Sequence, residues 1–252
     1  MTDWTPLDDE LDRMEMPFPV WWRDDDALTD TTALNRLIRL SERNGWPLHL
    51  AIVPAHADAA LADRLRDAAT VIPVTHGWAH VSHAPKTEKN AEFGAHRAAD
   101  VMAAEAGQGH ARLEDLLGEA PAPMFVPPWN RIAPDLLPLL PGQGFDMIST
   151  YNPRKTPRVV PGLTRVNTHL DPIDWHGGRS LVDPQALVNK LARDLADRRE
   201  GRADATEPYG LLTHHLVHDD AIWDFVETFF THLCNAPLYF WSARDPQTEP
   251  NS

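Results

Sequence analysis

The regular alternation of short apolar runs with amphipathic stretches is the feature that most constrains the fold of this chain. In residues 31–44, for example, Leu34, Leu37 and Ile38 recur at helical spacing, and Gly45 supplies a C-terminal stop. The pattern predicts strands at 18–22, 48–53, 71–75, 124–126, 145–149, 163–166, 210–213 and 237–241, and helices at 31–44, 57–69, 86–117 (broken near Gly107 and Gly109), 133–140, 183–199 and 219–233. Such alternation implies an α/β fold with parallel strands inside and helices outside.

Composition and charge exclude several classes of protein. No change in composition divides the 252 residues, so we expect one domain over 1–252, with 1–16 as an N-terminal extension and 243–252 as a flexible tail. The formal net charge of −14 disfavours nucleic acid and anionic membranes as partners. No apolar run approaches the ~20 residues of a membrane span, and residues 1–15 lack the features of a secretory signal. Cys234 is the single cysteine and cannot form an internal disulfide, which suggests a reducing compartment. Together these features lead us to expect a soluble cytoplasmic protein without membrane insertion.

Polar side chains gather directly after the predicted strands. The acidic run 24–26 follows the first strand and the segment 76–83 follows the third. Segments 127–130, 171–175 and 214–218 follow three later strands. In an α/β barrel the C-terminal ends of all strands open on one face, where active sites are built. We therefore expect the five segments to converge in one cleft.

The acidic run and a histidine pair together suggest a metal site. Three adjacent carboxylates at 24–26 repel one another, and a bound cation would offset this repulsion. A solvated turn or a helix N-cap is the simpler reading of the run alone. His76 and His80 are four residues apart and can share one face of a turn, although two surface histidines is the simpler reading of that pair. Two histidines and one aspartate leave room for water and substrate, as in catalytic rather than structural metal sites.

Further candidates lie in the remaining segments. His214 ends a buried strand and could serve as a general acid, or could simply belong to a polar rim. Trp78, Trp129 and Trp175 lie in or beside the same segments, whereas Trp21, Trp46, Trp223 and Trp241 are expected in the core. Aromatic planes beside a polar metal site suit the apolar faces of sugar rings; core packing is the competing interpretation.

Taken together, the five segments resemble the polysaccharide deacetylases, family 4 of the carbohydrate esterases, from about residue 20 to His215. The segment 25–27 resembles the first motif of the family, and His76 with His80 resembles the second. The segment 125–130 resembles the third motif, 171–175 the fourth and 212–214 the fifth. The family fold is a distorted barrel of about seven β/α units, so this resemblance implies a distorted (β/α)7-type barrel.

The resemblance also implies a role for each site residue. Asp25 would be the base, with a register one residue earlier as the alternative, and Asp26, His76 and His80 would hold a divalent metal. His214 would be the acid, oriented by Asp174. Substrate would be bound by five side chains of these segments: Trp78, Pro128, Trp129, Asn130 and Trp175.

Two details of the resemblance stay open. The third motif of the family often carries an Arg that orients the base; Val126 stands near that position, and Arg131 or Arg23 could substitute. The His and carboxylate set favours Zn²⁺, with Co²⁺, Mn²⁺ or Ni²⁺ as the other possibilities.

The implied activity is that of a hydrolase of carbohydrate metabolism. It would remove an acetyl or other small acyl group from an N-acylated sugar or a related small amide, cleaving a non-peptide C–N bond, with a small molecule or glycan as substrate. A deformylase-like or allantoinase-like enzyme acting on a non-carbohydrate amide is the alternative. A non-catalytic metal-binding or sugar-binding relative is a third possibility.

Overall fold

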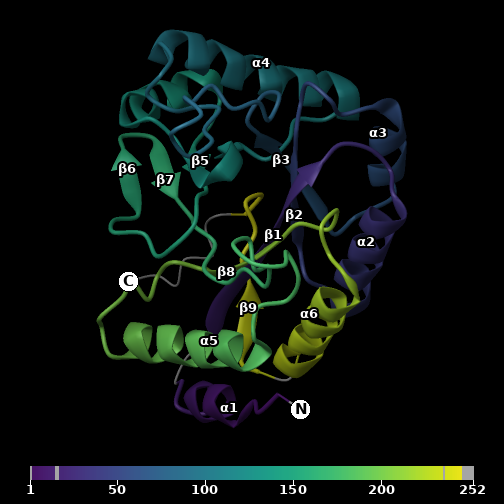
Figure 1. The fold of residues 1–252 in the computed structure, drawn as a ribbon, viewed down its shortest axis with the longest axis vertical. Helices are drawn as coiled ribbons and strands as arrows, with labels where there is room; N and C mark the ends of the chain where they lie inside the picture. Colours follow the sequence, from purple (N-terminus) through teal and green to yellow (C-terminus); the bar gives the residue numbers. More distant parts are fainter. Residues whose placement is uncertain (1, 15–16, 235, 246–252) are drawn as a thin grey trace.

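The computed structural model describes residues 2–14, 17–234 and 236–245, and its centre is a curved sheet of mainly parallel strands (Figure 1). The sheet order is β6-β7-β5-β4-β3-β2-β1-β8, with β9 paired to β1. Only β6 and β7 pair antiparallel among the named strands of the described chain. The strands are β1 (Phe18–Ala27), β2 (Leu48–Ile52), β3 (Val71–His76), β4 (Met124–Val126), β5 (Met147–Ile148), β6 (Arg158–Val160), β7 (Leu163–Arg165), β8 (Tyr209–Thr213) and β9 (Leu238–Phe240).

The sheet curls until its two sides meet beyond β7. The chain after β7 runs parallel to the chain after β5, where Thr168 bridges Tyr151. Two residues later Leu170 forms a parallel bridge with Leu211 of β8. This contact joins the β7 side of the sheet to the β8 side. The predicted α/β fold with a distorted seven-unit barrel is thus confirmed.

The helices lie around the outside of the strands (Figure 1). They are α1 (Thr5–Leu11), α2 (Thr32–Asn44), α3 (Ala59–Leu65), α4 (Ala99–Leu117), α5 (Pro184–Arg199) and α6 (Asp220–Leu233), with 3₁₀ segments η1 (Pro128–Asn130) and η2 (Pro134–Gln143). Helix ends follow the capping signals of the sequence: the Thr31 side chain accepts a hydrogen bond from the Leu34 N–H, and Gly45 closes α2 at φ 67°. In the described part of the chain, no helix is long and apolar enough to cross a membrane.

The helix predicted over residues 86–117 is wrong in its start and in its break. Helix α4 begins at Ala99 and continues through Gly107 and Gly109, while residues 86–98 form a loop except for a bridge at Phe93. Gly109 is required by packing, because a Cβ there would lie 3.0 Å from the carbonyl oxygen of Gly77. The glycine therefore allows α4 to approach the segment after β3 closely, and it does not interrupt the helix.

Other differences are local. The N-terminal extension contains α1, whose Leu7 and Leu11 are buried. Strand β6 was not predicted, and the helix expected at 133–140 is the 3₁₀ segment η2, which contains Pro138 and Pro141. The expected flexible tail begins at Ala243, which is buried, and its residues 246–252 lie outside the described part.

The largest difference that bears on function concerns β1. The sequence predicts that the strand ends before the acidic run, but β1 continues to Ala27 and contains all three aspartates. Asp24 and Asp25 are 0% and 2% exposed, so the solvated-turn interpretation of the run is wrong. Side chains alternate between the two sides of a strand, so Arg23 and Asp25 point to one side and Asp24 to the other.

The core also holds a histidine that must stay neutral. Trp21, Trp46, Trp223 and Trp241 are buried as predicted, and Trp21 and Trp241 pack against the ring of His49. His49 Nδ1 donates to the carbonyl oxygen of Trp22 (3.0 Å), and Nε2 accepts from the N–H of Ala243 (3.0 Å). Burial lowers the pKa of His49 to about 4.

Folding stability should therefore fall in mild acid. A histidine with a depressed folded-state pKa takes up a proton more readily when unfolded, so stability is lost as pH falls from about 6.5 towards 4. Between pH 7 and pH 5 the contribution of His49 is about 2 kcal/mol. Denaturant unfolding of wild type and His49→Gln at pH 7 and pH 5 gives the change in the free energy of unfolding for each protein. The difference between these two changes is the contribution of His49. An equal pH dependence in both proteins would contradict the assignment.

Candidate active site

Asp26, His76 and His80 come together at the C-terminal ends of β1 and β3. Asp26 Oδ1 lies 3.1 Å from His76 Nε2 and 3.2 Å from His80 Nε2. One donor atom from each residue lies within 4.8 Å of the others. His76 Nδ1 donates to the carbonyl oxygen of Val126 (3.0 Å), which leaves Nε2 free to bind a metal.

These three residues fit a divalent transition metal. Tetrahedral ligands at about 2.0–2.1 Å from an ion are separated by about 3.3 Å, close to the distances of Asp26 Oδ1 from the two Nε2 atoms. Two imidazole nitrogens and one carboxylate oxygen are also donors that Zn²⁺, Co²⁺ and Ni²⁺ accept. Asp26 and His80 adopt left-handed backbone conformations at φ 74° and φ 56°, which are costly for residues with a Cβ. The fold therefore holds two of the three residues in strained conformations that bring their side chains together.

The electrostatics of the cluster favour a cation. Burial opposes ionisation of Asp26, but hydrogen bonding and charge from His76 outweigh it, so the pKa of Asp26 is lowered. Burial likewise opposes protonation of His76, but the Asp25 and Asp26 carboxylates outweigh it, and the pKa of His76 is raised. Burial and the neighbouring His76 lower the pKa of His80. Asp26 is thus ionised beside the two histidines, and the negative charge of the site favours a positively charged partner.

Asp25 is held by a buried arginine from its own strand. Arg23 Nε lies 2.8 Å from Asp25 Oδ1, and Nη2 lies 2.9 Å from Oδ2, so the guanidinium grips the carboxylate with two parallel hydrogen bonds. Arg23 is 0% exposed. Arg131, the other candidate, instead donates to the carbonyl oxygen of Asn90. Of the two candidates, Arg23 is therefore the one that contacts Asp25.

Two residues assigned to substrate from the sequence have other contacts. Asn130 Oδ1 accepts a hydrogen bond from Arg23 Nη2 (2.8 Å), so its amide supports the group that grips Asp25. Pro128 is buried and packs beside Gly77, where a Cβ would lie 2.6 Å from its ring. A buried ring that covers a glycine is a packing contact, and the substrate role of Pro128 stays a prediction.

Asp24 belongs to a separate buried pair on the other side of β1. Its Oδ1 lies 2.5 Å from His215 Nδ1, and its Oδ2 accepts from Thr213 Oγ1 (2.6 Å) and from the N–H of His215 (3.0 Å). Burial opposes ionisation, but His215 outweighs it and the pKa of Asp24 is lowered. These contacts commit Asp24 to the end of β8, while Asp25 and Asp26 face the cluster.

His214 lies opposite Asp25. Its Nε2 is 3.9 Å from Asp25 Oδ2, and the side chain is largely buried. Its Nδ1 is buried without a hydrogen-bond partner among the described residues. The ring of Trp175 packs edge-on against it, with 4.7 Å between centroids.

No hydrogen bond or ion pair joins Asp174 to His214 among the described residues, and the orienting role of Asp174 stays a prediction. Asp174 Oδ1 accepts from the N–H groups of His176 and Gly177, so it caps the loop that follows. Within the segment 171–175, the carboxylate that interacts electrostatically with His214 is Asp171; burial raises the pKa of Asp171, and the attraction of His214 only partly opposes this rise. Asp171 Oδ2 also accepts from Trp175 Nε1 (2.8 Å). Asp171 and Asp174 thus differ in their partners, and only Asp171 interacts with both Trp175 and His214.

The tryptophans divide between the site and the core. The centroid of the Trp129 ring lies 4.3 Å from the centroid of the His80 ring. The backbone of Trp129 is left-handed, at φ 57°. Trp175 is 38% exposed, which is incompatible with core packing. Trp78 is partly buried and packs its side chain against the apolar cluster of α4, η2 and β4. Its substrate role stays a prediction.

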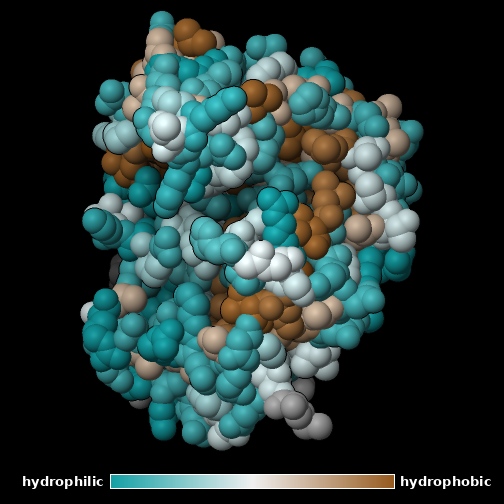
Figure 2. Space-filling view, viewed as in Figure 1, coloured by the Kyte–Doolittle hydropathy of each residue, from teal (hydrophilic) through white to brown (hydrophobic). Residues whose placement is uncertain are grey.

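The loop from His214 to α6 crosses the middle of the view in Figure 1. Figure 2 shows the same face hollowed near its centre, with hydrophilic and hydrophobic side chains around the hollow. Three exposed apolar side chains lie within the site segments: Val81, Trp175 and Leu216. The region around the cluster therefore offers apolar surface beside polar groups.

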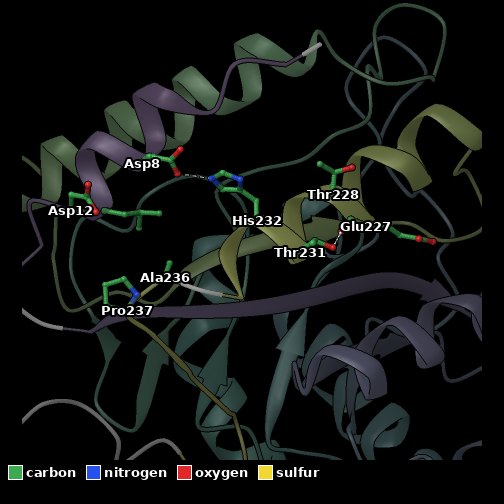
Figure 3. A pocket seen from close by; sticks show the side chains of 9 residues that line it. Asp8, Asp12, Glu227, Thr228, Thr231, His232, Ala236 and Pro237 are labelled. Atoms are coloured by element: carbon green, nitrogen blue, oxygen red, sulfur yellow. Dashed lines mark hydrogen bonds and ion pairs between the residues drawn. The ribbon is translucent and has the colours of Figure 1, made fainter.

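A second hollow, of about 720 Å³, lies at the other end of the strands between α1 and α6. In Figure 3 His232 and Asp8 face each other there, 2.6 Å apart, and Glu227 and Asp12 complete an acidic wall. Pro237, at its edge, accepts a hydrogen bond from the first residue of β1. The hollow is therefore remote from the histidine cluster.

Sequence reasoning missed three residues that support the site. His215 pairs with Asp24, Asp171 faces His214, and the buried Glu92 contacts the segment that carries His80. The first two stand beside motif residues, so their positions were visible although their partners were not. Glu92 lies in a stretch read as helix, and no signal in the sequence identifies it.

No protein-family model and no curated protein sequence matches this chain. Solved structures do match its fold. A family 4 carbohydrate esterase from Streptomyces lividans, solved with acetate, is 16% identical with a TM-score of 0.57, covering 92% of this chain and 95% of its own. The peptidoglycan N-acetylglucosamine deacetylase Bc1960 is 15% identical with a TM-score of 0.55, covering 94% of both chains. A family 4 acetyl xylan esterase from Clostridium thermocellum, solved with a cobalt ion, is 15% identical with a TM-score of 0.52, covering 91% and 90%.

The chain therefore has the fold of the family 4 carbohydrate esterases and polysaccharide deacetylases. The resemblance noted from the sequence motifs is confirmed at this level. At such low identity the likeness establishes the fold, and function has to be argued from the site itself.

The Arg23–Asp25 pair should behave as a buried ion pair in unfolding experiments. Arg23→Leu leaves the Asp25 charge without its partner and should lower the free energy of unfolding by about 3–5 kcal/mol. Adding Asp25→Asn removes that charge and should recover part of the loss. The exposed pair Arg66 and Asp63 gives a matched control, worth at most about 1 kcal/mol. Denaturant unfolding of the single and double variants gives the coupling energy of each pair. Equal coupling energies for the buried pair and the exposed pair would contradict the assignment.

Proposed function

We propose that this chain is a metal-dependent deacetylase that hydrolyses the amide bond of a small N-acylated substrate. The observation that carries the proposal is the approach of Asp25 and His214 to 3.9 Å, beside the cluster of Asp26, His76 and His80. A carboxylate and an imidazole facing each other next to three metal-type donors are groups that suit metal-assisted amide hydrolysis.

Asp26, His76 and His80 would hold the metal. When bound, a divalent ion supplies polarisation of the acyl oxygen and a lowered pKa for a coordinated water. The strained backbone of Asp26 and His80 supports this role, because strain of this kind concentrates at functional sites.

Asp25 would accept the proton of the attacking water. Arg23 fixes the orientation of the carboxylate and keeps its charge compensated in a buried setting. As the water oxygen bonds to the acyl carbon, its proton moves to Asp25. A fixed acceptor needs no rearrangement at the moment of attack.

His214 would donate a proton to the leaving nitrogen as the C–N bond breaks. The products are then a free amine and a small carboxylate. The Asp171 carboxylate acts electrostatically on His214 and is the better candidate for orienting it than Asp174. The edge of the Trp175 ring limits the movement of the imidazole from the other side.

The walls of the site favour an N-acylated sugar as substrate. Trp129 and Trp175 present aromatic rings beside His80 and His214, and sugar rings place their C–H faces on such surfaces. Arg23 supplies a guanidinium that orients Asp25, which favours a catalytic protein over the non-catalytic alternative. A non-carbohydrate amide is the remaining alternative, and it is decided by experiment.

The activity test is a panel of N-acetyl sugars, N-formyl sugars and non-carbohydrate amides, incubated with Zn²⁺-loaded and chelator-treated protein. We expect acetate or formate release from a sugar substrate and its loss with chelator. Asp25→Asn and His214→Ala should each lower kcat by about 10²–10⁴-fold while metal content stays unchanged.

The exposed residues Asp30 and His56 provide the controls, and Asp30→Asn and His56→Ala should turn over normally. Near-normal turnover by either Asp25→Asn or His214→Ala would remove that residue from the mechanism. Release from the non-carbohydrate amides alone would reassign the substrate class.

Trp175→Ala tests the substrate wall. Because the ring is 38% exposed, its removal should lower thermal stability little. Loss of an aromatic stacking partner should weaken substrate binding by about 1–3 kcal/mol, seen as a raised KM. Metal affinity should not change. Melting temperature and KM measured on one preparation decide the matter: a large stability loss with unchanged KM would return Trp175 to a packing role.

A further inference from the structure

The short turn after β3 carries His80, and its geometry decides where that imidazole lies. The turn starts at Gly77, at φ 59°, and ends at His80, at φ 56°. Its backbone N–H groups are not paired in a helix or a strand, because residues 77–80 belong to neither. Some other group has to satisfy them if the turn is to keep one conformation.

The Glu92 carboxylate provides this group. Its Oε1 accepts from the N–H of Ala79 (2.7 Å) and of Val81 (3.5 Å), and its Oε2 accepts from the N–H of Trp78 (3.2 Å). Glu92 is only 1% exposed. Hydrogen bonds to a buried carboxylate are about twice as strong as those between neutral groups, so three amides of one turn converge on a firm anchor.

The absence of a side chain at Gly77 leaves space for this carboxylate. A Cβ at position 77 would lie 2.4 Å from Glu92 Oε2 and 2.6 Å from the ring of Pro128. The glycine is therefore required by the approach of Glu92 as well as by its own positive φ. On the opposite side Gly109 of α4 lies against the carbonyl oxygen of Gly77, so the turn is enclosed by side chain and backbone.

We infer that Glu92 is a positioning residue for the candidate metal centre: it fixes the turn 77–81 so that His80 Nε2 stays beside Asp26 before any ion binds. The inference rests on the proposed function, because it assigns a metal to the cluster of Asp26, His76 and His80. Glu92 touches neither the ion nor the substrate. Its effect is to remove the cost of ordering His80 when the metal binds.

The test measures metal affinity rather than turnover. Glu92→Gln keeps the shape of the side chain but replaces one accepting oxygen by an NH₂ group that faces backbone N–H donors. Zn²⁺ affinity, measured by competition with a chromophoric chelator, should fall by about 10–100-fold, the usual effect of losing such a supporting group. The visible spectrum of the Co²⁺-loaded protein should change as His80 loses its fixed position.

Glu88→Gln is the matched control. Glu88 lies on the same loop, is exposed, and pairs with His96 at 3.3 Å, so its loss should leave Zn²⁺ affinity unchanged. Glu92→Asp is the second variant, in case Glu92→Gln does not fold. It keeps the charge but withdraws both oxygens by one carbon–carbon bond, and it should show a smaller loss of affinity.

The outcomes separate this inference from the proposed function. A wild-type protein that binds no Zn²⁺ would overturn both. A wild type that binds Zn²⁺ and a Glu92→Gln variant with the same affinity and Co²⁺ spectrum would overturn only the role of Glu92. A lowered melting temperature of the metal-free variant with unchanged affinity would likewise overturn that role, since it shows that Glu92 stabilises the fold without positioning His80.

Discussion

Three consecutive carboxylates at the end of β1 are the constraint on which the site depends. Left together, they would repel one another in a buried setting. The strand separates them: Asp24 turns to His215 on one side, and Asp25 turns to Arg23 on the other. Asp26 leaves the regular strand conformation and meets His76 and His80. Each carboxylate thus has its own partner, and each partner comes from an element that the barrel places at the same end.

Much of the fold could be read from the sequence because its signals are local. Helix α2 ends where Gly45 allows a left-handed turn, and α5 and α6 begin at Asp183 and Asp219, whose side chains cap the first N–H groups. The start of α4 and the course of residues 86–98 were not readable. An alanine-rich stretch favours helix, but the buried Glu92 and its contacts with the turn after β3 override that preference.

The sequence predicted which residues form the candidate site better than it predicted which of them contact one another. The spacing of His76 and His80 reflects one turn of chain, so their proximity follows from the sequence. The partner of Asp25 did not follow from spacing alone, because Arg131 and Arg23 were both near in sequence to site motifs. Only the extension of β1 through the acidic run settles the matter, since residues two apart on a strand share a side. The choice between Asp171 and Asp174 likewise depends on a loop whose turn conformation has no clear sequence signal.

The location of Arg23 on the same strand as Asp25 has a consequence for how the molecule can change. A base whose counter-ion arrives on a distant loop ties the sequence of that loop to the chemistry. Here the two groups are carried by one rigid strand, two residues apart, and their alignment is inherited from the sheet. Of the segment 127–131, only Asn130 reaches Arg23 through its side chain. The side chain of Trp129, which does not contact Arg23, can therefore be exchanged while the Arg23–Asp25 pair stays intact, which makes this position a natural place for selection or design to alter the surface beside the cluster.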